Sequence, residues 1–533
     1  MPTFKLDDRD IPFEPGDTII RAAHRVGVDI PHYCWHPGLS VAANCRMCLV
    51  EIAPPPGRPA LMLDVLAWDA ERGDYVPQRK PKLQPACQQA CADGMVVKSQ
   101  TSDHVLRARS AVQELLLLNH PVDCPICDQA GECRLQDYWL EHQAKKKRMR
   151  DEPVHKPKGV VFGPTIVYDS ERCSVCTRCV RVSEELAKDP VLSVRERGNL
   201  NEITVAPGRQ LDHNYTLMTE YVCPVGALTA VDFRFKARVW FLRSARTVCT
   251  GCATGCNSFT DYDPRAQKVY RYRPRENMAV NKYWMCDVGM LDHKRIHEHR
   301  VLEARVGGEP TTRVSAVHKA AELLRRADPA STAVVLSAEH SQEDNAALLW
   351  LARDVLHVAG IYESGRPDGQ GDNILLDSDR NPNEAGIFEL VAPSAPKSFD
   401  DFLKAVTDGT IKTVLALGSQ VNDPSKPIPA SVELVALSTH EGPWAKRAKV
   451  LLPASSWAES DGTFVNAKGL RQLSEKAIEP QGASRPAYSL VAELAKVLGT
   501  PPGWKRLSDL QNAFSIQRSS ASPTAPVSAG AGS

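Results

Sequence analysis

Sixteen cysteines dominate the chemistry that this 533-residue sequence could perform, and all of them lie at or before Cys286. The densest stretch runs from His120 to Cys133 and combines three cysteines with one histidine. Soft thiolates at short, fixed spacings are the ligands that iron–sulfur clusters or zinc require. The chain therefore has a thiol-rich part, where metal chemistry is expected, and a long C-terminal part that contains no thiol.

The cysteines fall into four sets, each large enough to hold a metal centre. The first has the spacing C-x10-C-x2-C and a choice between two later thiols, so its members are Cys34, Cys45, Cys48 and either Cys87 or Cys91. The second, in which an imidazole stands in for one thiolate, comprises His120, Cys124, Cys127 and Cys133. The third, with the spacing C-x2-C-x2-C and a distant fourth thiol, comprises Cys173, Cys176, Cys179 and Cys223. The fourth, with the spacing C-x2-C-x3-C and a distant fourth thiol, comprises Cys249, Cys252, Cys256 and Cys286.

Iron–sulfur clusters explain these spacings better than zinc. The third set ends in Cys223-Pro224 and resembles the bacterial ferredoxin pattern, which favours a [4Fe–4S] cluster. The first set departs from the C-x4-C-x2-C of soluble plant-type ferredoxins, although the hairpin and helix expected before it resemble the start of that fold. A neutral imidazole at His120 would make its cluster less negative by one charge and, on electrostatics alone, favour the reduced state. Zinc could satisfy any one set, but four sets in one chain argue against zinc throughout.

Several structural elements can be predicted around these sets. Residues 3–6 and 11–13 are strand candidates, and the apolar spacing of residues 18–26 and 102–118 predicts two helices. The insertion that begins at Pro54 is rich in proline and is expected to form a surface loop. In the thiol-free part, short apolar runs at 333–336, 414–417 and 449–452 alternate with helical patterns and predict an α/β fold.

Composition excludes some functions. A formal net charge of +1 and the lack of a sustained basic face argue against nucleic-acid binding. The sequence shows no signal peptide and no run of about eighteen apolar residues, so we expect a cytoplasmic protein that does not span a membrane. No G-x-G-x-x-G occurs, which places hydride chemistry in another chain. Residues 517–533 are rich in Ser, Ala, Pro and Gly and are expected to be disordered.

The order of these motifs resembles the large iron–sulfur subunit of NADH:quinone oxidoreductase, respiratory complex I. The phrases NHPVDCPICDQAGEC (119–133) and PACQQACADGMVV (85–97) carry the likeness, which is strong over residues 1–300. It implies one [2Fe–2S] cluster, held by Cys34, Cys45, Cys48 and Cys87, and a [4Fe–4S] cluster at each of the other three sets. The fourth set resembles the extra cluster found only in some bacterial members. Residues 455–472 resemble the molybdopterin-oxidoreductase fold, which this family carries without its cofactor.

The resemblance implies a multidomain chain. Residues 1–100 would form a β-grasp ferredoxin-type [2Fe–2S] domain of α+β class, and 101–150 the [4Fe–4S] segment whose ligands are one histidine and three cysteines. Residues 151–240 would form a [4Fe–4S] ferredoxin-type domain, and 241–300 a [4Fe–4S] domain of the Mo/W bis-MGD type. A shortened α/β molybdopterin-oxidoreductase-like domain is expected at 301–512, and a disordered tail at 513–533.

The resemblance also implies a function. The chain would be an electron-transfer subunit that receives electrons singly from a flavin- and NADH-binding subunit and passes them toward quinone. It would have neither the hydride site nor the quinone site, no molybdopterin, and no nucleic-acid partner. It would assemble with other peripheral-arm subunits of complex I on the cytoplasmic side of the inner (plasma) membrane, reaching the membrane only through them.

Two alternatives compete with this interpretation. One is the diaphorase-side iron–sulfur subunit of a soluble NAD-linked hydrogenase or formate dehydrogenase. The catalytic chains of those enzymes need further cysteines or a full molybdopterin domain, which the thiol-free part argues against. The other is a zinc-stabilised nucleic-acid binder, which the near-zero net charge disfavours.

Overall fold

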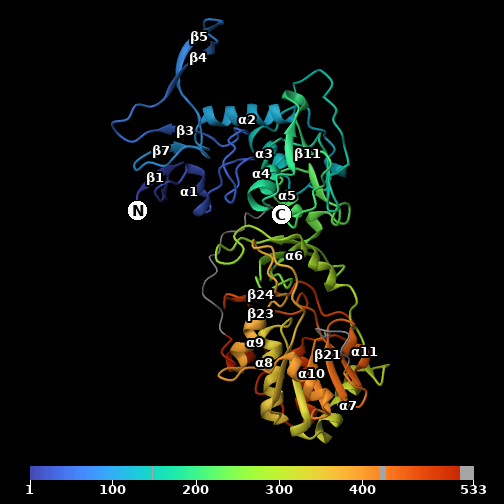
Figure 1. Ribbon diagram of the computed structural model, residues 1–533. Helices are drawn as coiled ribbons and strands as arrows, with labels where there is room; N and C mark the ends of the chain where they lie inside the picture. Colours follow the sequence, from blue (N-terminus) through green and yellow to red (C-terminus); the bar gives the residue numbers. More distant parts are fainter. Residues whose placement is uncertain (147, 419–427, 517–533) are drawn as a thin grey trace. The chain divides into compact units, whose positions relative to one another are not determined.

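The computed structural model describes residues 1–146, 148–418 and 428–516, so residues 517–533 of the expected tail lie outside the described residues. The chain divides into two compact units, one from Met1 to Trp240 and one that begins at Phe241 (Figure 1). Three of the four cysteine sets lie in the first unit, and the set of Cys249 lies in the second.

A five-stranded sheet begins the first unit and has the strand order β2-β1-β7-β3-β6. Its strands are β1 (Thr3–Leu6), β2 (Arg9–Pro12), β3 (Leu49–Ala53), β6 (Gln84–Pro85) and β7 (Val96–Lys98). Asp7 and Asp8, between β1 and β2, both have positive φ, as the tight turn of a two-residue hairpin requires. The predicted first strand is confirmed, and the second begins two residues earlier than predicted.

Helix α1 (Ile19–Arg25) packs on this sheet and confirms the helix predicted at 18–26. Its buried side chains Ile19 and Ile20 join the core formed by the strands, which includes Phe4 and Val97. Because this core holds α1 in place, it also fixes the start of the loop after α1, which carries Cys34, Cys45 and Cys48.

The insertion between β3 and β6 lies at the surface, as expected, but it is not an irregular loop. Much of it forms an antiparallel hairpin of β4 (Met62–Asp69) and β5 (Asp74–Pro81), which extends away from the sheet that carries it (Figure 1). Trp68 and Tyr75 pair across the two strands, with ring centroids 5.3 Å apart. The proline cluster interrupts regular secondary structure only where the insertion begins. Beyond it, strand-forming side chains lie on both sides of a turn and favour a hairpin.

The rest of the first unit is built from short elements around the second and third cysteine sets. Helix α2 (Asp103–Leu117) confirms the helix predicted at 102–118, and its N-cap Ser102 accepts a hydrogen bond from the Val105 N–H. The remaining helices are α3 (Arg134–His142), α4 (Arg178–Arg181) and α5 (Thr216–Tyr221). The strands are β8 (Val160–Val161), β9 (Ile166–Tyr168), β10 (Leu192–Arg195), β11 (Glu202–Val205) and β12 (Leu228–Ala230).

The second unit opens with an antiparallel sheet that carries the fourth cysteine set. Its strands are β13 (Arg243–Val248), β14 (Asn257–Asp263) and β15 (Lys268–Pro274), and the short helix α6 (Asp287–Leu291) follows them. The loop between β13 and β14 holds three of the cysteines, and the fourth lies at the start of α6.

A seven-stranded sheet with the order β17-β16-β22-β21-β20-β18-β19 forms the body of the second unit. Its strands are β16 (Ala304–Val306), β17 (Glu309–Thr311), β18 (Thr332–Ser337), β19 (Gly360–Ser364), β20 (Thr413–Leu417), β21 (Glu433–Ser438) and β22 (Val450–Pro453). The last five run parallel, and β18, β20 and β22 confirm the predicted strands. A separate two-stranded sheet consists of β23 (Gly462–Val465) and β24 (Arg471–Ser474).

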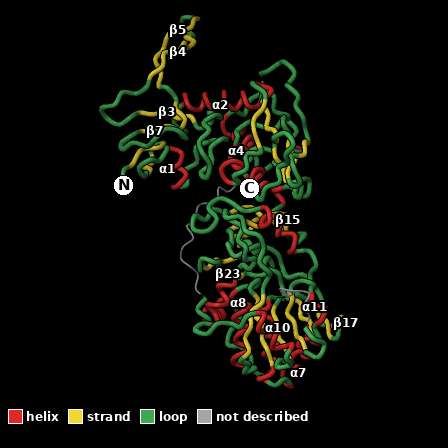
Figure 2. Tube along the Cα trace, viewed as in Figure 1, coloured by secondary structure: helices red, strands yellow, loops and turns green. Residues whose placement is uncertain are grey.

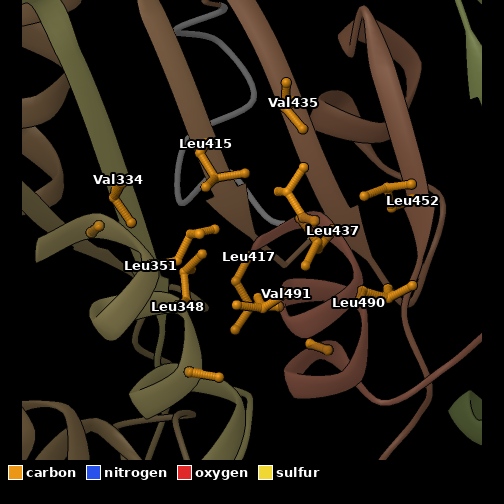
Figure 3. Packing of buried hydrophobic residues seen from close by; sticks show 14 of the residues in the cluster. Val334, Leu348, Leu351, Leu415, Leu417, Val435, Leu437, Leu452, Leu490 and Val491 are labelled. Atoms are coloured by element: carbon orange, nitrogen blue, oxygen red, sulfur yellow. The ribbon is translucent and has the colours of Figure 1, made fainter. Parts of the chain in front are cut away.

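Helices cover both faces of this parallel sheet, as the alternation of strand and helical patterns predicted (Figure 2). They are α7 (Arg313–Arg326), α8 (Gln342–Trp350), α9 (Glu384–Val391), α10 (Phe399–Thr407), α11 (Pro443–Arg447), α12 (Ala487–Leu498) and α13 (Leu507–Ala513). On one face, Leu415, Leu417 and Leu437 of the strands meet Leu348 of α8 and Leu490 of α12 (Figure 3). None of the helices among the described residues is long and apolar enough to cross a bilayer.

Candidate metal centres

The first set gathers its thiols beside the sheet of the first unit. Cys48 immediately precedes β3 and Cys87 follows β6, so the pairing of these strands brings the two thiols into hydrogen-bonding contact. Cys34 and Cys45 make the same contact, and the hydrogen bond from Cys45 lowers the pKa of Cys34 to about 5. Cys34, Cys48 and Cys87 are fully buried, and Cys45 is half-buried.

Cys91, the other candidate for this set, lies apart from it. Its backbone N–H donates to the carbonyl of Asp17 at 2.9 Å, and the half-buried thiol lies near the charges of Asp17 and Arg25. Burial raises the pKa of Cys91 to about 12. The structure thus brings Cys87, and not Cys91, to Cys48.

The second set lies in the loop that joins α2 to α3. Cys127 and Cys133 are buried, and burial raises the pKa of Cys133 to about 12, with the neighbouring thiols Cys127 and Cys124 adding to the effect. His120 is half-buried in the same loop, and burial lowers the pKa of its imidazole to about 4. A neutral imidazole keeps the lone pair with which histidine binds metals.

The third set encloses a small cavity. The cavity is lined by Tyr168, Cys173, Ser174, Cys176, Thr177, Cys179, Ile203, Cys223, Val225, Ala227 and Leu228. Val175 and Thr177, between the first three cysteines, have φ values of 49° and 59°, a left-handed conformation that non-glycine residues seldom adopt. The tight loop lets the Val175 N–H donate to the Sγ of Cys173 at 3.3 Å. All four thiols of the set thus line the same cavity.

The loops that carry the second and third sets are in direct contact. The N–H of Arg134, next to Cys133, donates to the carbonyl of Pro224, next to Cys223, at 3.1 Å. A Cβ atom at Gly226 would lie 2.2 Å from the Sγ of Cys127, so only glycine fits between the two loops. Sequence reasoning missed Gly226, whose only signal is its place three residues after Cys223.

The fourth set lies at one end of the antiparallel sheet of the second unit. Cys249 follows β13 and Cys256 precedes β14, and the N–H of Cys249 donates to the carbonyl of Cys256 at 2.8 Å. Cys286 is the N-cap of α6, where a Cβ at Gly289 would lie 3.0 Å from the Sγ of Cys249 and 3.5 Å from that of Cys286. These thiols and Cys252 are all buried, and burial raises the pKa of Cys286 to about 12.

The donor chemistry of the four sets fits iron–sulfur clusters. Backbone N–H groups donate to sulfur in three of the sets, from Tyr33 to Cys45 (3.5 Å), from Val175 to Cys173 (3.3 Å), from Gly251 to Cys249 (3.4 Å) and from Gly289 to Cys286 (3.3 Å). Such bonds stabilise a cluster-bound thiolate and tune its potential. Among the described residues, no three His, Cys, Asp or Glu side chains converge as tightly as a single metal ion requires.

Two buried arginines, also missed by sequence reasoning, join the first and third sets. The Nη2 of Arg181 donates to the carbonyl of Cys34 at 2.6 Å and to that of Cys176 at 3.2 Å. Arg178 donates to the carbonyl of Val222, beside Cys223, at 3.0 Å and to that of Trp35, beside Cys34. Their only sequence signal is the interleaving of basic residues with the cysteines of the third set.

A polar cavity lies at the carboxyl ends of the parallel strands in the second unit, the edge where such sheets commonly bind ligands. Two arginines in it share one carboxylate, with Arg295 and Arg366 lying 3.1 and 3.4 Å from Glu339. His340 and His440, which follow β18 and β21, also line the cavity, and burial lowers the pKa of both imidazoles and favours their neutral form. The cationic side chains at this edge are therefore already engaged within the protein.

Four family models match the chain in the order in which its elements occur. They describe a 2Fe-2S iron-sulfur cluster binding domain (residues 1–102), an NADH-ubiquinone oxidoreductase-G iron-sulfur binding region (109–148), an NADH-quinone oxidoreductase subunit 3 ferredoxin-like domain (163–229) and a molybdopterin oxidoreductase (337–497). The chain thus contains iron–sulfur binding domains of both the [2Fe–2S] and the [4Fe–4S] type, followed by a molybdopterin-oxidoreductase-like α/β domain.

Named relatives agree with these models. The G subunit of NADH-quinone oxidoreductase from Streptomyces coelicolor is 37% identical over 54% of this chain and 31% of its own length. The corresponding G subunit from Mycobacterium bovis is 33% identical over 69% of this chain and 43% of its own length. NADH-quinone oxidoreductase subunit 3 of Thermus thermophilus is 35% identical over 56% of this chain and 39% of its own length. The chain thus spans less than half the length of these relatives.

One solved structure also matches part of the chain. The crystal structure of NAD+-reducing [NiFe]-hydrogenase in the H2-reduced state matches 45% of this chain and 91% of its own chain, with 28% identity and a TM-score of 0.36. A likeness this slight bears on neither fold nor function.

Replacing Cys87 should remove the centre of the first set, whereas replacing Cys91 should not. Cys87→Ser takes away a thiol that contacts Cys48, and Cys91→Ser alters a thiol beside Asp17. EPR of the reduced protein should show the [2Fe–2S] signal undiminished in Cys91→Ser and lost in Cys87→Ser. The reverse pattern would show that Cys91 is the ligand.

Gly226→Ala should disrupt the second set although it changes no ligand. The added methyl group would lie 2.2 Å from the Sγ of Cys127, a separation that forces the loop or the thiol to move. We expect a loss of about four irons per chain, the content of one [4Fe–4S] cluster. Gly503→Ala, where a Cβ meets no atom within 4 Å and φ is not positive, is the matched control and should retain its iron. Full iron content in Gly226→Ala would contradict the contact.

Proposed function

This chain is a relative of the G subunit of NADH-quinone oxidoreductase, and we propose that it is an electron-transfer subunit of such a complex. It takes electrons one at a time from a flavin- and NADH-binding subunit and passes them toward quinone. The observation that carries the proposal is the gathering of three sets of soft donors, most of them buried and the rest half-buried, within one compact unit. The hydride and quinone sites belong to other chains.

Four ligand sets follow from this proposal. A [2Fe–2S] cluster is held by Cys34, Cys45, Cys48 and Cys87. Three [4Fe–4S] clusters are held by His120, Cys124, Cys127 and Cys133; by Cys173, Cys176, Cys179 and Cys223; and by Cys249, Cys252, Cys256 and Cys286. The buried thiols and the N–H groups that donate to sulfur support these assignments.

The protein's own contribution is to position and insulate the donors. Iron–sulfur clusters supply one-electron chemistry, at potentials set by net charge, burial and hydrogen bonds to sulfur. Burial of most of the thiols limits the access of water to the sets. The Arg134 N–H, Gly226 and Arg181 fix the three ligand loops of the first unit against one another.

The second unit has a different role in this proposal. No cysteine follows Cys286, so an electron that reached the fourth set would find no further thiol-bound centre in this chain. The fourth set ties the β13–β14 loop to the start of α6 and is mainly structural. The α/β domain carries no molybdopterin. The mutual pairing of Arg295, Arg366 and Glu339 supports this, because it engages the cations that an anionic cofactor would need.

The partners follow from the same relationship. The chain assembles with the flavin- and NADH-binding subunit and with other peripheral-arm subunits, on the cytoplasmic side of the inner (plasma) membrane. Its own contact with the membrane is made through those subunits.

Iron analysis tests the proposal directly. One [2Fe–2S] and three [4Fe–4S] clusters predict about fourteen irons and as many acid-labile sulfides per chain. The measurement is anaerobic iron and sulfide analysis of the native assembly, with EPR after reduction by NADH. Substantial zinc, or the lack of a [2Fe–2S] signal, would refute the cluster assignment, and a fully loaded assembly that NADH cannot reduce would refute the electron-transfer role.

Replacing a ligand of the fourth set should lower stability more than turnover. Binding of a metal centre contributes directly to folding, on the order of 10 kcal/mol in small metal domains. Cys252→Ala should therefore reduce the yield or melting temperature of the assembled complex, while NADH-to-quinone turnover per flavin stays near that of the wild type. Cys91→Ala, which removes a thiol outside the sets, is the control. Normal assembly with lost turnover would place the fourth set on the electron path.

A further inference from the structure

Arg178 and Arg181 are buried cations without a carboxylate partner. They are 5% and 7% exposed, and no Asp or Glu oxygen among the described residues lies within 4 Å of either guanidinium. Burying an unpaired charge is costly, by several kcal/mol even after relaxation of the protein. Such a group persists in a fold only where something compensates its charge.

Two other arginines with buried side chains do have a carboxylate partner. Arg300 pairs with Glu459 at 2.7 Å, and the two side chains are 3% and 0% exposed. Arg172, which lies in the first unit, pairs with Asp123 at 2.6 Å. Arg109, which is fully buried beside Cys48, lacks a carboxylate among the described residues as Arg178 and Arg181 do, whereas Arg172, next to Cys173, has one.

The hydrogen bonds of the two unpaired arginines all end on the backbone of ligand loops or next to them. Arg181 reaches the carbonyls of Cys34, Cys176, Ser40 and Thr177. Arg178 reaches the carbonyls beside Cys34 and Cys223. Both guanidinium groups therefore lie between the first and third sets. Arg109 repeats the pattern at Cys48, where it donates to the carbonyls of the residues on either side.

We propose that Arg178 and Arg181 are the shared counter-cations of the [2Fe–2S] and [4Fe–4S] sites formed by the first and third sets. Four thiolates bound to a cluster give each site a net negative charge, which is the anion that the two arginines otherwise lack. A nearby cation stabilises the more negative, reduced state of a cluster and raises its potential. This inference rests on the proposed function, and it makes the two arginines positioning residues that also set the potentials.

Arg181 is the sharper test, because one guanidinium nitrogen contacts the backbone of both sites. Arg181→Gln keeps hydrogen-bond donors and loses the charge, whereas Arg181→Lys keeps the charge. In redox titrations of the native complex followed by EPR, we expect Arg181→Gln to lower the potential of the [2Fe–2S] cluster and of one [4Fe–4S] cluster. The expected change is about tenfold in each reduction equilibrium, equal to 59 mV for one electron. Arg181→Lys should stay near wild type.

Two control variants distinguish an effect of the lost charge from an effect on the structure of the loops. Arg195→Gln removes an arginine of the same unit that Glu202 already neutralises, and it should leave all potentials unchanged. Arg178→Gln should shift the same two clusters as Arg181→Gln. Loss of iron in Arg181→Gln but not in Arg181→Lys would also support the proposal, because assembly would then depend on the charge.

Two results would overturn it. One is full iron content with unchanged potentials in both glutamine variants, which would mean that the arginines only tie the loops. The other is equal loss of iron in Arg181→Gln and Arg181→Lys, which would assign Arg181 a purely structural role. A wild-type complex without the clusters would instead refute the proposed function, so the two failures are distinguishable by iron analysis.

Discussion

A thiol buried away from water holds its proton more tightly, and most of the candidate ligands in this chain are buried. Burial raises the pKa of Cys133 and of Cys286 to about 12 and that of Cys173 to about 11. Metal ligation requires thiolates, so these thiols must lose their protons when a metal centre binds. The positive charge of the metal then stabilises the thiolates and the loops that carry them. The short loops, the N–H groups aimed at sulfur and the arginines between the sets all serve this one electrostatic requirement.

The ligand residues could be predicted from sequence because their types and spacings are set by the metal chemistry itself. The alternation of apolar runs with helical patterns likewise predicted the parallel sheet, whose strands are apolar on both faces because helices cover both. The choice between Cys87 and Cys91 could not be made from spacing alone. In the structure, the pairing of β3 with β6 brings Cys87 to Cys48, a contact between strands that no local pattern encodes.

Other features depend on contacts between residues far apart in the chain. Arg181 looks in sequence like an ordinary surface charge, and its burial depends on the loop of Cys34, 147 residues earlier. Position 226 requires glycine because the thiol of Cys127 lies against it, a constraint that no sequence rule for turns would predict. The β4–β5 hairpin was missed for a different reason, since the proline-rich start of the insertion obscured the strand-forming residues beyond it.

The interlocked ligand loops have a consequence for the way the protein is made. Ribosomes extend a chain at about 5–20 residues per second, so the loop of Cys127 emerges roughly ten seconds before Gly226 can pack against it. The loop of Cys34 waits still longer for the guanidinium of Arg181. Until then the early thiols are exposed to oxidants and to stray metal ions. The third set is itself incomplete until Cys223 is made, so cluster assembly in the first unit is tied to the synthesis of its last segment.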